Sequence, residues 1–209
     1  MRLEAENIGY RYRTGQWILR DVNVGWESGE VLGLTGPSGC GKTTLARVLA
    51  GYHRPRRGRV RLNGAPLPRE GYHPVQLVFQ HPEKAINARW HLSSTVKEGY
   101  RPDAKQLACL GIEREWLRRW PHELSGGELQ RFCIARALGP DTRFLIADEM
   151  TTMLDAITQV QICQELLAIV RQRNLGLMLV SHESSLLRRL CDRVIELPAQ
   201  TGGNKSFNW

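Results

Sequence analysis

Residues 31–43 read VLGLTGPSGCGKT, a short apolar run that ends in a glycine-rich turn. Residues 36–43 match the pattern G-x-x-x-x-G-K-[S/T], and a helical pattern follows from Thr43 to Ala50. Where a strand, a glycine-rich turn and a helix follow one another, backbone N–H groups converge on an anion at the start of the helix. The segment therefore predicts a phosphate-binding loop.

The side chains of this loop have separate predicted tasks. Lys42 would reach the β- and γ-phosphates of a nucleotide, and the Thr43 hydroxyl would bind Mg²⁺. The glycines let the backbone curl around the phosphate oxygens. The alternative is a glycine-rich turn with a surface lysine, which the strand–loop–helix context disfavours. The predicted nucleotide-binding residues of the loop are Gly36, Ser38, Gly39, Cys40, Gly41, Lys42, Thr43 and Thr44.

A second chemical feature is the sequence FLIADE at residues 144–149. Asp148 and Glu149 end an apolar run, where two buried carboxylates are costly unless a cation or an attacking water lies there. Asp148 is therefore predicted to hold Mg²⁺, and Glu149 to act as general base. The alternative, two acids that only mark the end of a strand, is disfavoured beside a phosphate loop.

The pattern of apolar residues indicates an α/β fold. Residues 3–30 read as antiparallel strands, and residues 56–63 alternate up to an Asn-Gly turn. Residues 82–138 look mostly helical and contain no strand-like run. Continuous apolar strands at 144–147 and 177–180 flank a helical pattern at 156–173, which predicts a parallel sheet with helices on both faces.

Composition excludes several classes of protein. The chain has 209 residues, of which 42% are hydrophobic and 24% charged, which excludes disorder as the main state. No run of 18 apolar residues could span a membrane, and five scattered cysteines without a C-x-x-C pair disfavour a disulfide framework or a zinc site.

The net charge of +8 points to polyanionic partners, which are nucleic acid, anionic lipid or nucleotide phosphate. Most of the basic residues are arginines, and the segment RPRRGRVR at residues 54–61 forms a basic hairpin. For this hairpin a solvated face, contact with anionic lipid headgroups and contact with nucleic acid are all open interpretations.

Residues 124–131 read LSGGELQR and open another helix. Ser125 and Glu128 form an S-x-x-E capping box, which is the local interpretation. Two consecutive glycines, Gly126 and Gly127, go beyond capping and would bare backbone N–H groups at a positive helix end. A phosphate loop and a remote anion-binding helix end suggest two chains that close over one nucleotide.

With these motifs in this order, residues 2–197 resemble the ATP-binding cassette family, the nucleotide-binding subunits of ABC transporters. The resemblance implies that Tyr12 stacks on adenine and that Gln80 contacts Mg²⁺ and the attacking water. It also implies that Asp155 lies in a loop across the dimer interface and that His182 contacts the γ-phosphate.

The family fold implied is a P-loop NTPase with a RecA-like α/β core, an antiparallel β lobe and an inserted helical lobe. We expect one ABC ATPase domain over residues 1–200, with the helical lobe at 82–135. Residues 201–209 are expected to form a mobile tail.

The activity implied is hydrolysis of ATP with Mg²⁺. The expected catalytic residues are Glu149, His182, Gln80 and Lys42. The expected metal ligands, partly through water, are Thr43, Gln80 and Asp148. The resemblance places Ser125, Gly126, Gly127 and Glu128 across a dimer from the phosphate loop.

The partners implied are transmembrane permease subunits, a second ABC ATPase in a homodimer or heterodimer, and an extracytoplasmic substrate-binding protein. The chain is expected at the cytoplasmic face of the inner membrane, without a nucleic-acid partner. Residues 79–89 and 159–162 resemble the oligopeptide, dipeptide and nickel uptake branch. The alternative is a non-transport ABC ATPase that acts on DNA or ribosomes.

Overall fold

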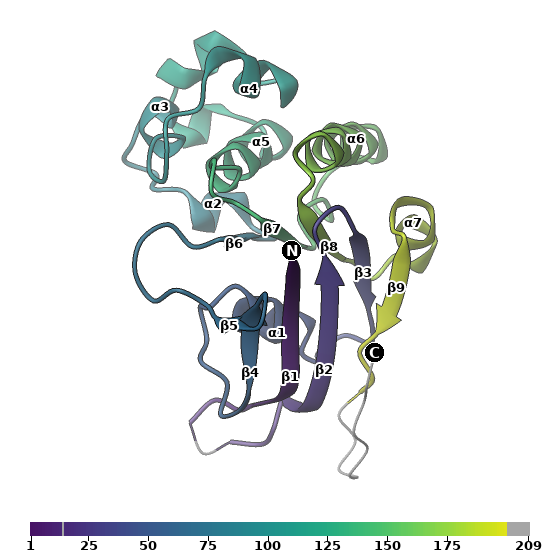
Figure 1. Ribbon diagram of the computed structural model, residues 1–209. Coiled ribbons are helices and arrows are strands. Elements are labelled where there is room, and N and C mark those ends of the chain that lie inside the picture. The colour runs from purple at the N-terminus through teal and green to yellow at the C-terminus, as the bar shows by residue number, and fades with distance from the viewer. Residues whose placement is uncertain (14, 200–209) are drawn as a thin grey trace.

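The computed structural model describes residues 1–13 and 15–199 (Figure 1). The predicted mobile tail at 201–209 lies outside the described residues. Among the helices that the structure describes, none is both long and apolar enough to cross a bilayer.

Five strands form a parallel sheet in the order β6-β7-β8-β3-β9. Their bounds are β6 (Val75–Val78), β7 (Phe144–Asp148), β8 (Gly176–Val180), β3 (Val31–Thr35) and β9 (Arg193–Glu196). The predicted parallel sheet is confirmed, and β9 is a further strand that pairs with β3. Because all five strands run the same way, the phosphate loop after β3 and the acidic end of β7 lie at the same edge of the sheet.

Alternate residues of each strand supply two separate hydrophobic cores. In β7, Leu145 and Ala147 belong to the core beneath helices α5 (Gly126–Ala137), α6 (Ala156–Arg173) and α7 (Ser184–Leu190). Phe144 and Ile146 belong to the core shared with α1 (Lys42–Leu49) and the antiparallel sheet. The sheet is thus covered on both faces, as predicted (Figure 1).

The antiparallel sheet has the strand order β2-β1-β4-β5. Its strands are β2 (Leu19–Glu27), β1 (Arg2–Tyr10), β4 (Arg57–Leu62) and β5 (Ala65–Pro66). The predicted Asn-Gly turn joins β4 to β5, with φ of 51° at Asn63 and 78° at Gly64, as a tight hairpin requires. Trp26 of β2 meets Phe144 of β7 edge to face, with centroids 5.4 Å apart, and so joins the two sheets.

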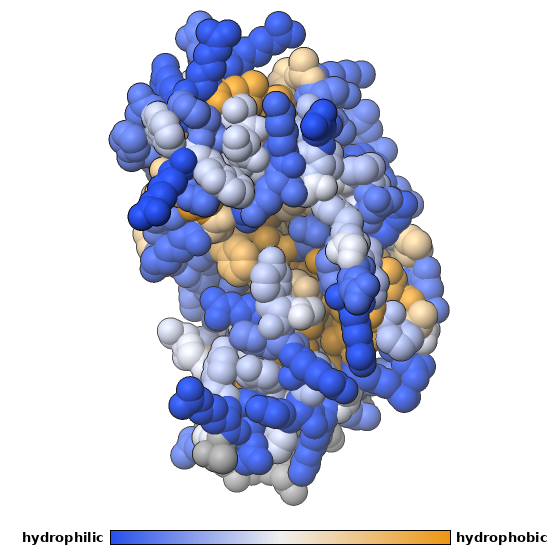
Figure 2. All heavy atoms as spheres, turned by 90° about the vertical axis from the view of Figure 1, so that its left-hand side faces the viewer, coloured by the Kyte–Doolittle hydropathy of each residue, from blue (hydrophilic) through white to orange (hydrophobic). Residues whose placement is uncertain are grey.

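A helical lobe lies at the end of the molecule opposite the antiparallel sheet (Figure 1). It contains α2 (Pro82–Ala85), α3 (Leu92–Thr95), α4 (Ala104–Cys109) and the 3₁₀ turns η1 (Arg114–Arg118) and η2 (Pro121–Glu123) ahead of α5. The prediction of a strand-free segment is confirmed, although its helices before α5 are short. Pro102 and Pro121 lack the N–H that would continue a helix across those positions. On the face seen in Figure 2, hydrophilic side chains cover both ends of the molecule, and apolar atoms show mainly in a recessed band between them.

Candidate functional site

The predicted phosphate loop connects β3 to α1. At Gly36 φ is 149°, and a Cβ there would collide with the carbonyl oxygen of Leu197, so only glycine fits. Gly41 caps α1 at a φ of 107° and offers no side chain to the first helical N–H groups. These N–H groups have no intrahelical acceptor either, so the start of α1 can accept an anion.

The other loop residues differ in exposure. Ser38 and Gly39 are exposed, whereas Cys40 and Thr44 are buried. Burial raises the pKa of the Cys40 thiol above its ordinary value.

Lys42 is 5% exposed and lies folded back against its own loop. Its Nζ donates to the carbonyl oxygens of Gly36 and Pro37 at 2.9 and 3.0 Å. The same Nζ lies 3.5 Å from Nδ1 of His182, which comes from the turn after β8. The ammonium group is therefore satisfied by carbonyl oxygens, and it already lies beside a second predicted catalytic residue.

The three predicted metal ligands line one cavity of about 250 Å³. The Thr43 hydroxyl donates to Oδ1 of Asp148 at 3.3 Å, and Gln80 faces the same cavity from the segment after β6. Asp148 is 3% exposed, and this burial raises the pKa of its carboxyl group, while the Thr43 hydroxyl acts in the opposite direction. All three side chains offer the oxygen atoms that Mg²⁺ prefers.

Glu149 follows directly in a left-handed conformation, with φ of 49°. Its N–H donates to the carbonyl oxygen of Val180 at 3.0 Å, which turns the residue away from the strand direction of β7. Its Oε1 lies 2.5 Å from Nε2 of His182. The backbone turn and the histidine together hold the carboxylate at the edge of the sheet.

Two residues that the sequence prediction missed complete this site. The Thr152 hydroxyl donates to the carbonyl oxygen of Glu149 at 3.0 Å and accepts from Nε2 of Gln80 at 3.2 Å. Arg47 of α1 lines the cavity, and its charge offsets part of the rise that burial causes in the pKa of Asp148. Arg47 lies one helical turn beyond Thr43, and this spacing was the signal that could have identified it.

The structure thus brings together six predicted residues from four segments of the chain. The six are Lys42, Thr43, Gln80, Asp148, Glu149 and His182. Tyr12 lies apart from them, 44% exposed, with its ring edge-on to His53 at 5.5 Å and its hydroxyl 3.3 Å from Nε2 of that residue.

The glycine pair of the second predicted anion site begins α5. Ser125 accepts from the N–H of Glu128 at 3.3 Å, and the Glu128 carboxylate accepts from the N–H of Ser125 at 2.7 Å, so the capping box is present. Ser125 and Gly126 are exposed. A Cβ on Gly127 would lie 2.8 Å from Cγ2 of Thr158 in α6, so this glycine lets the two helices approach.

Asp155 caps the first turn of α6. Its Oδ1 accepts from the N–H groups of Ile157 and Thr158 at 3.1 and 3.0 Å, and its Oδ2 accepts from the Thr158 hydroxyl at 2.6 Å. The hydrogen bond from this hydroxyl is the main cause of the lowered pKa of the Asp155 carboxyl group. Thr158 therefore contacts both Asp155 and the start of α5, which joins the two exposed segments.

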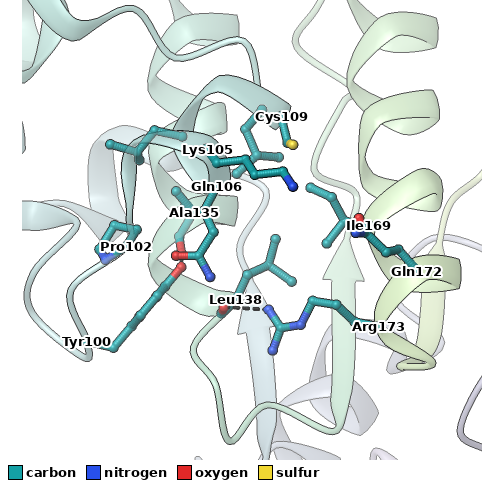
Figure 3. Close-up of a pocket in the computed structure, with 12 residues that line it drawn as sticks. Tyr100, Pro102, Lys105, Gln106, Cys109, Ala135, Leu138, Ile169, Gln172 and Arg173 are labelled. Carbon is teal, nitrogen blue, oxygen red and sulfur yellow. Dashed lines mark hydrogen bonds between the residues drawn. The ribbon is translucent and has the colours of Figure 1, made fainter.

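Another cavity of about 250 Å³ lies between α4, α5 and α6 and contains none of the predicted site residues (Figure 3). Arg173 donates from its guanidinium group to the carbonyl oxygen of Leu138 at 2.6 Å (Figure 3). The same group donates to the carbonyl oxygen of Gly139, also at 2.6 Å. This cavity is lined mainly by apolar atoms, and it carries no chemistry comparable to that around Asp148.

Known proteins are similar to this chain in both sequence and fold. A family profile described as ABC transporter matches residues 19–152. The nickel import ATP-binding protein NikE of Pseudomonas putida is 35% identical, over 93% of this chain and 81% of that protein. The nickel import system ATP-binding protein NikE of Staphylococcus aureus is 33% identical, over 93% and 86%.

Solved structures support the same fold at lower sequence identity. The ATP-binding cassette MJ0796, in a dimeric post-hydrolysis state bound to ADP and Pi, superimposes with a TM-score of 0.80 at 22% identity, over 99% of this chain and 100% of that chain. The cbiO1 protein of Clostridium perfringens, part of the ABC transporter complex cbiONQ, gives a TM-score of 0.77 at 24% identity, over 93% and 83%.

Proposed function

Since the chain belongs to the ABC transporter family, we propose that its site around Asp148 and Glu149 hydrolyses ATP to power uptake of nickel or peptides. It is an ATPase that drives an ABC transporter, as its family and its nickel import relatives indicate. The observation that carries the proposed site is the convergence of Lys42, Thr43 and Asp148 with Gln80 and His182 at one edge of the sheet.

The phosphate loop binds the triphosphate of ATP. The free N–H groups at the start of α1 and the left-handed turns of Gly36 and Gly41 form a cradle for phosphate oxygens. Lys42 exchanges the carbonyl oxygens of Gly36 and Pro37 for the β- and γ-phosphates, so a buried charge that now contacts only dipoles gains an anionic partner.

Thr43, Asp148 and Gln80 would hold Mg²⁺. The fit rests on the cavity that they share and on the buried Asp148 carboxylate, whose pKa is raised because burial disfavours its charged form. When bound, Mg²⁺ neutralises the negative charge of the β- and γ-phosphates. Asp148 would bind the ion as its carboxylate, because an adjacent cation favours the ionised form.

Glu149 positions the attacking water. Water oxygen forms a bond to the γ-phosphorus, the bond from that phosphorus to the β–γ bridging oxygen breaks, and Glu149 takes the proton of the water. Gln80 orients this water through its amide, which Thr152 holds from the other side. His182 keeps Glu149 at the edge of the sheet and contacts the γ-phosphate.

The exposed start of α5 completes the site of a second cassette. Ser125 and Gly126 face solvent in the single chain, and the N–H groups at this helix end suit the γ-phosphate of a partner chain. Asp155, linked to Gly127 through Thr158, lies at the same surface. Two chains, identical or related, therefore enclose two ATP molecules, and their closure transmits the energy of ATP.

We further propose the partners and the location that the resemblance to ABC transporters implies. The chain binds permease subunits at the cytoplasmic face of the inner membrane, and an extracytoplasmic substrate-binding protein delivers the cargo. Nickel is the cargo of the NikE relatives, which are 32–35% identical to this chain, and peptides are the cargo of the wider branch.

The proposal is tested with Glu149→Gln, and with Glu183→Gln as a matched control. Glu183 precedes α7 as its N-cap but makes no side-chain capping bond there, so its amide variant removes the same charge outside the proposed chemistry. We expect Glu149→Gln to lower ATP turnover by about 10²–10⁴-fold and to form an ATP-dependent dimer by light scattering. Near-normal turnover together with a monomeric state in ATP would refute the two-chain site.

A further inference from the structure

A second basic site lies on the antiparallel lobe, remote in sequence from Asp148. An open hollow of about 550 Å³ is lined by five residues, four of them arginines and none of them acidic. We call it the arginine hollow, and its residues are Arg11, Arg13, Trp17, Arg56 and Arg57. Figure 2 shows crowded hydrophilic side chains over the lower end of the molecule, which carries this lobe.

Trp17 holds two of these arginines in place. The guanidinium carbons of Arg11 and Arg57 lie over its ring, 5.0 and 4.9 Å from the centroid. The ring itself fits because position 9 is a glycine, where a Cβ would lie 3.0 Å from both Trp17 and Arg57. A guanidinium group stacked on an aromatic ring keeps its N–H edges free, so both arginines remain available to an anion.

The surrounding charge favours an anion as well. Arg56 also lines an adjoining hollow of about 790 Å³, which Arg54, Arg59 and Arg69 face and which no carboxylate lines. Arg59 is partnered by Glu6 at 2.7 Å, in contrast to the stacked pair. Another acid, Asp21, lines a small third hollow with Trp17, Arg20 and Arg57. Positive charges therefore greatly outnumber acids here, and a polyanion would relieve their mutual repulsion.

We propose that the arginine hollow is a binding site for phosphate groups, distinct from the phosphate loop. Guanidinium groups bind phosphate oxygens in bidentate pairs, and two stacked guanidiniums cost less ordering entropy than two free ones. The ligand is an anionic phosphate compound, which can be a phospholipid headgroup or a soluble polyphosphate. The inference rests on the charge and geometry of this lobe, so it stands independently of the proposed transport function.

Calorimetric titration of tripolyphosphate into the full chain tests the site, with the phosphate loop first saturated by Mg·ADP. Arg11→Gln/Arg57→Gln should bind about a hundredfold more weakly than the unmodified chain, since a hydrogen bond to a charged group, which contributes about tenfold, is lost at each position. The matched control, Arg171→Gln/Arg189→Gln, removes the same charge from exposed positions on α6 and α7 and should bind normally.

Trp17→Leu distinguishes a specific binding site from general charge attraction, since it leaves every arginine in place. Weaker binding by this variant, with an unchanged far-UV circular dichroism spectrum, supports the site. If Trp17→Leu does not fold, the comparison of Arg11→Gln/Arg57→Gln with its control variant decides the test. Equal weakening of the arginine pair and its control would overturn the proposal, because binding would then follow net charge.

Co-sedimentation with vesicles identifies the source of the phosphate. Binding to phosphatidylcholine vesicles only when they contain phosphatidylglycerol, with loss in the Arg11/Arg57 variant, assigns a lipid headgroup. Binding of tripolyphosphate without vesicle binding assigns a soluble phosphate. Binding of neither probe, or a preference for single-stranded RNA that the Arg11/Arg57 variant retains, would overturn the proposal.

Discussion

Replacement of Gly127 by alanine tests how closely helix α5 packs against the start of α6. The new Cβ would lie 2.8 Å from Cγ2 of Thr158, about 0.6 Å inside the 3.4 Å at which ordinary van der Waals contact begins. Overpacking of this kind costs about 1–3 kcal/mol, and the loss of a helical glycine returns about 0.5–1 kcal/mol. We therefore expect Gly127→Ala to lower the free energy of unfolding by about 1 kcal/mol.

A second substitution isolates the contact that causes this loss. Thr158→Ser removes Cγ2 but keeps the hydroxyl that donates to Asp155 at 2.6 Å. In the Thr158→Ser background, Gly127→Ala should be neutral or stabilising, which gives a coupling free energy of about 1–2 kcal/mol.

Urea unfolding of the four proteins, followed by circular dichroism, measures this cycle, provided that the m-values agree. The reasoning fails if Gly127→Ala costs the same in both backgrounds to within about 0.5 kcal/mol. In that case α5 and α6 would accommodate the methyl group by another movement, and the link between Gly127 and Asp155 would carry no strain.

Three further predictions follow from single groups at the site. Asp148→Asn should abolish ATP turnover yet raise the melting temperature at pH 7. Burial raises the pKa of Asp148, so the ionised form costs stability above that pKa, and thermal scans should show the gain vanish as pH falls below the ordinary value of 3.8. Iodoacetamide should label exposed Cys109 before buried Cys40, because burial raises the pKa of the Cys40 thiol. Mass spectrometry of peptides measures the order of labelling, and labelling of Cys40 first would contradict this prediction. Tyr12→Ala should raise the KM for ATP about three- to tenfold with little change in kcat, because an adenine-stacking ring contacts only the base; an unchanged KM in steady-state assays would rule out stacking.

Local signals account for much of the fold that sequence reasoning predicted. The helix predicted over 156–173 coincides with α6 because both of its ends are marked locally. Asp155 caps its first N–H groups, and Asn174 ends it in a left-handed conformation with φ of 51°. The Asn-Gly turn after β4 formed for the same reason, since a two-residue turn depends on its own backbone angles.

Elements whose ends carry no capping or turn residues were not predicted from the sequence. β9 has only four residues, of which the first and the last are charged, so its place beside β3 depends on a partner about 160 residues away. The helical lobe was predicted to contain no strand, but the lengths of its helices were not predicted. α2 and α3 are short, and their lengths depend on how their few buried residues reach the core beneath α5.

The sequence alone determined the chemical groups of the candidate site, because the glycine-rich loop and the acidic strand end each need particular residues at adjacent positions. Only the tertiary structure decided which atoms meet. Thr43 and Asp148 are 105 residues apart, and the bonds of Thr152 to Gln80 and Glu149 depend on the order of the strands. The same holds for Arg11, Trp17 and Arg57 in the arginine hollow. Hydrogen bonds and pKa shifts depend on distance and burial, and both are set by the packing of segments that are remote in sequence.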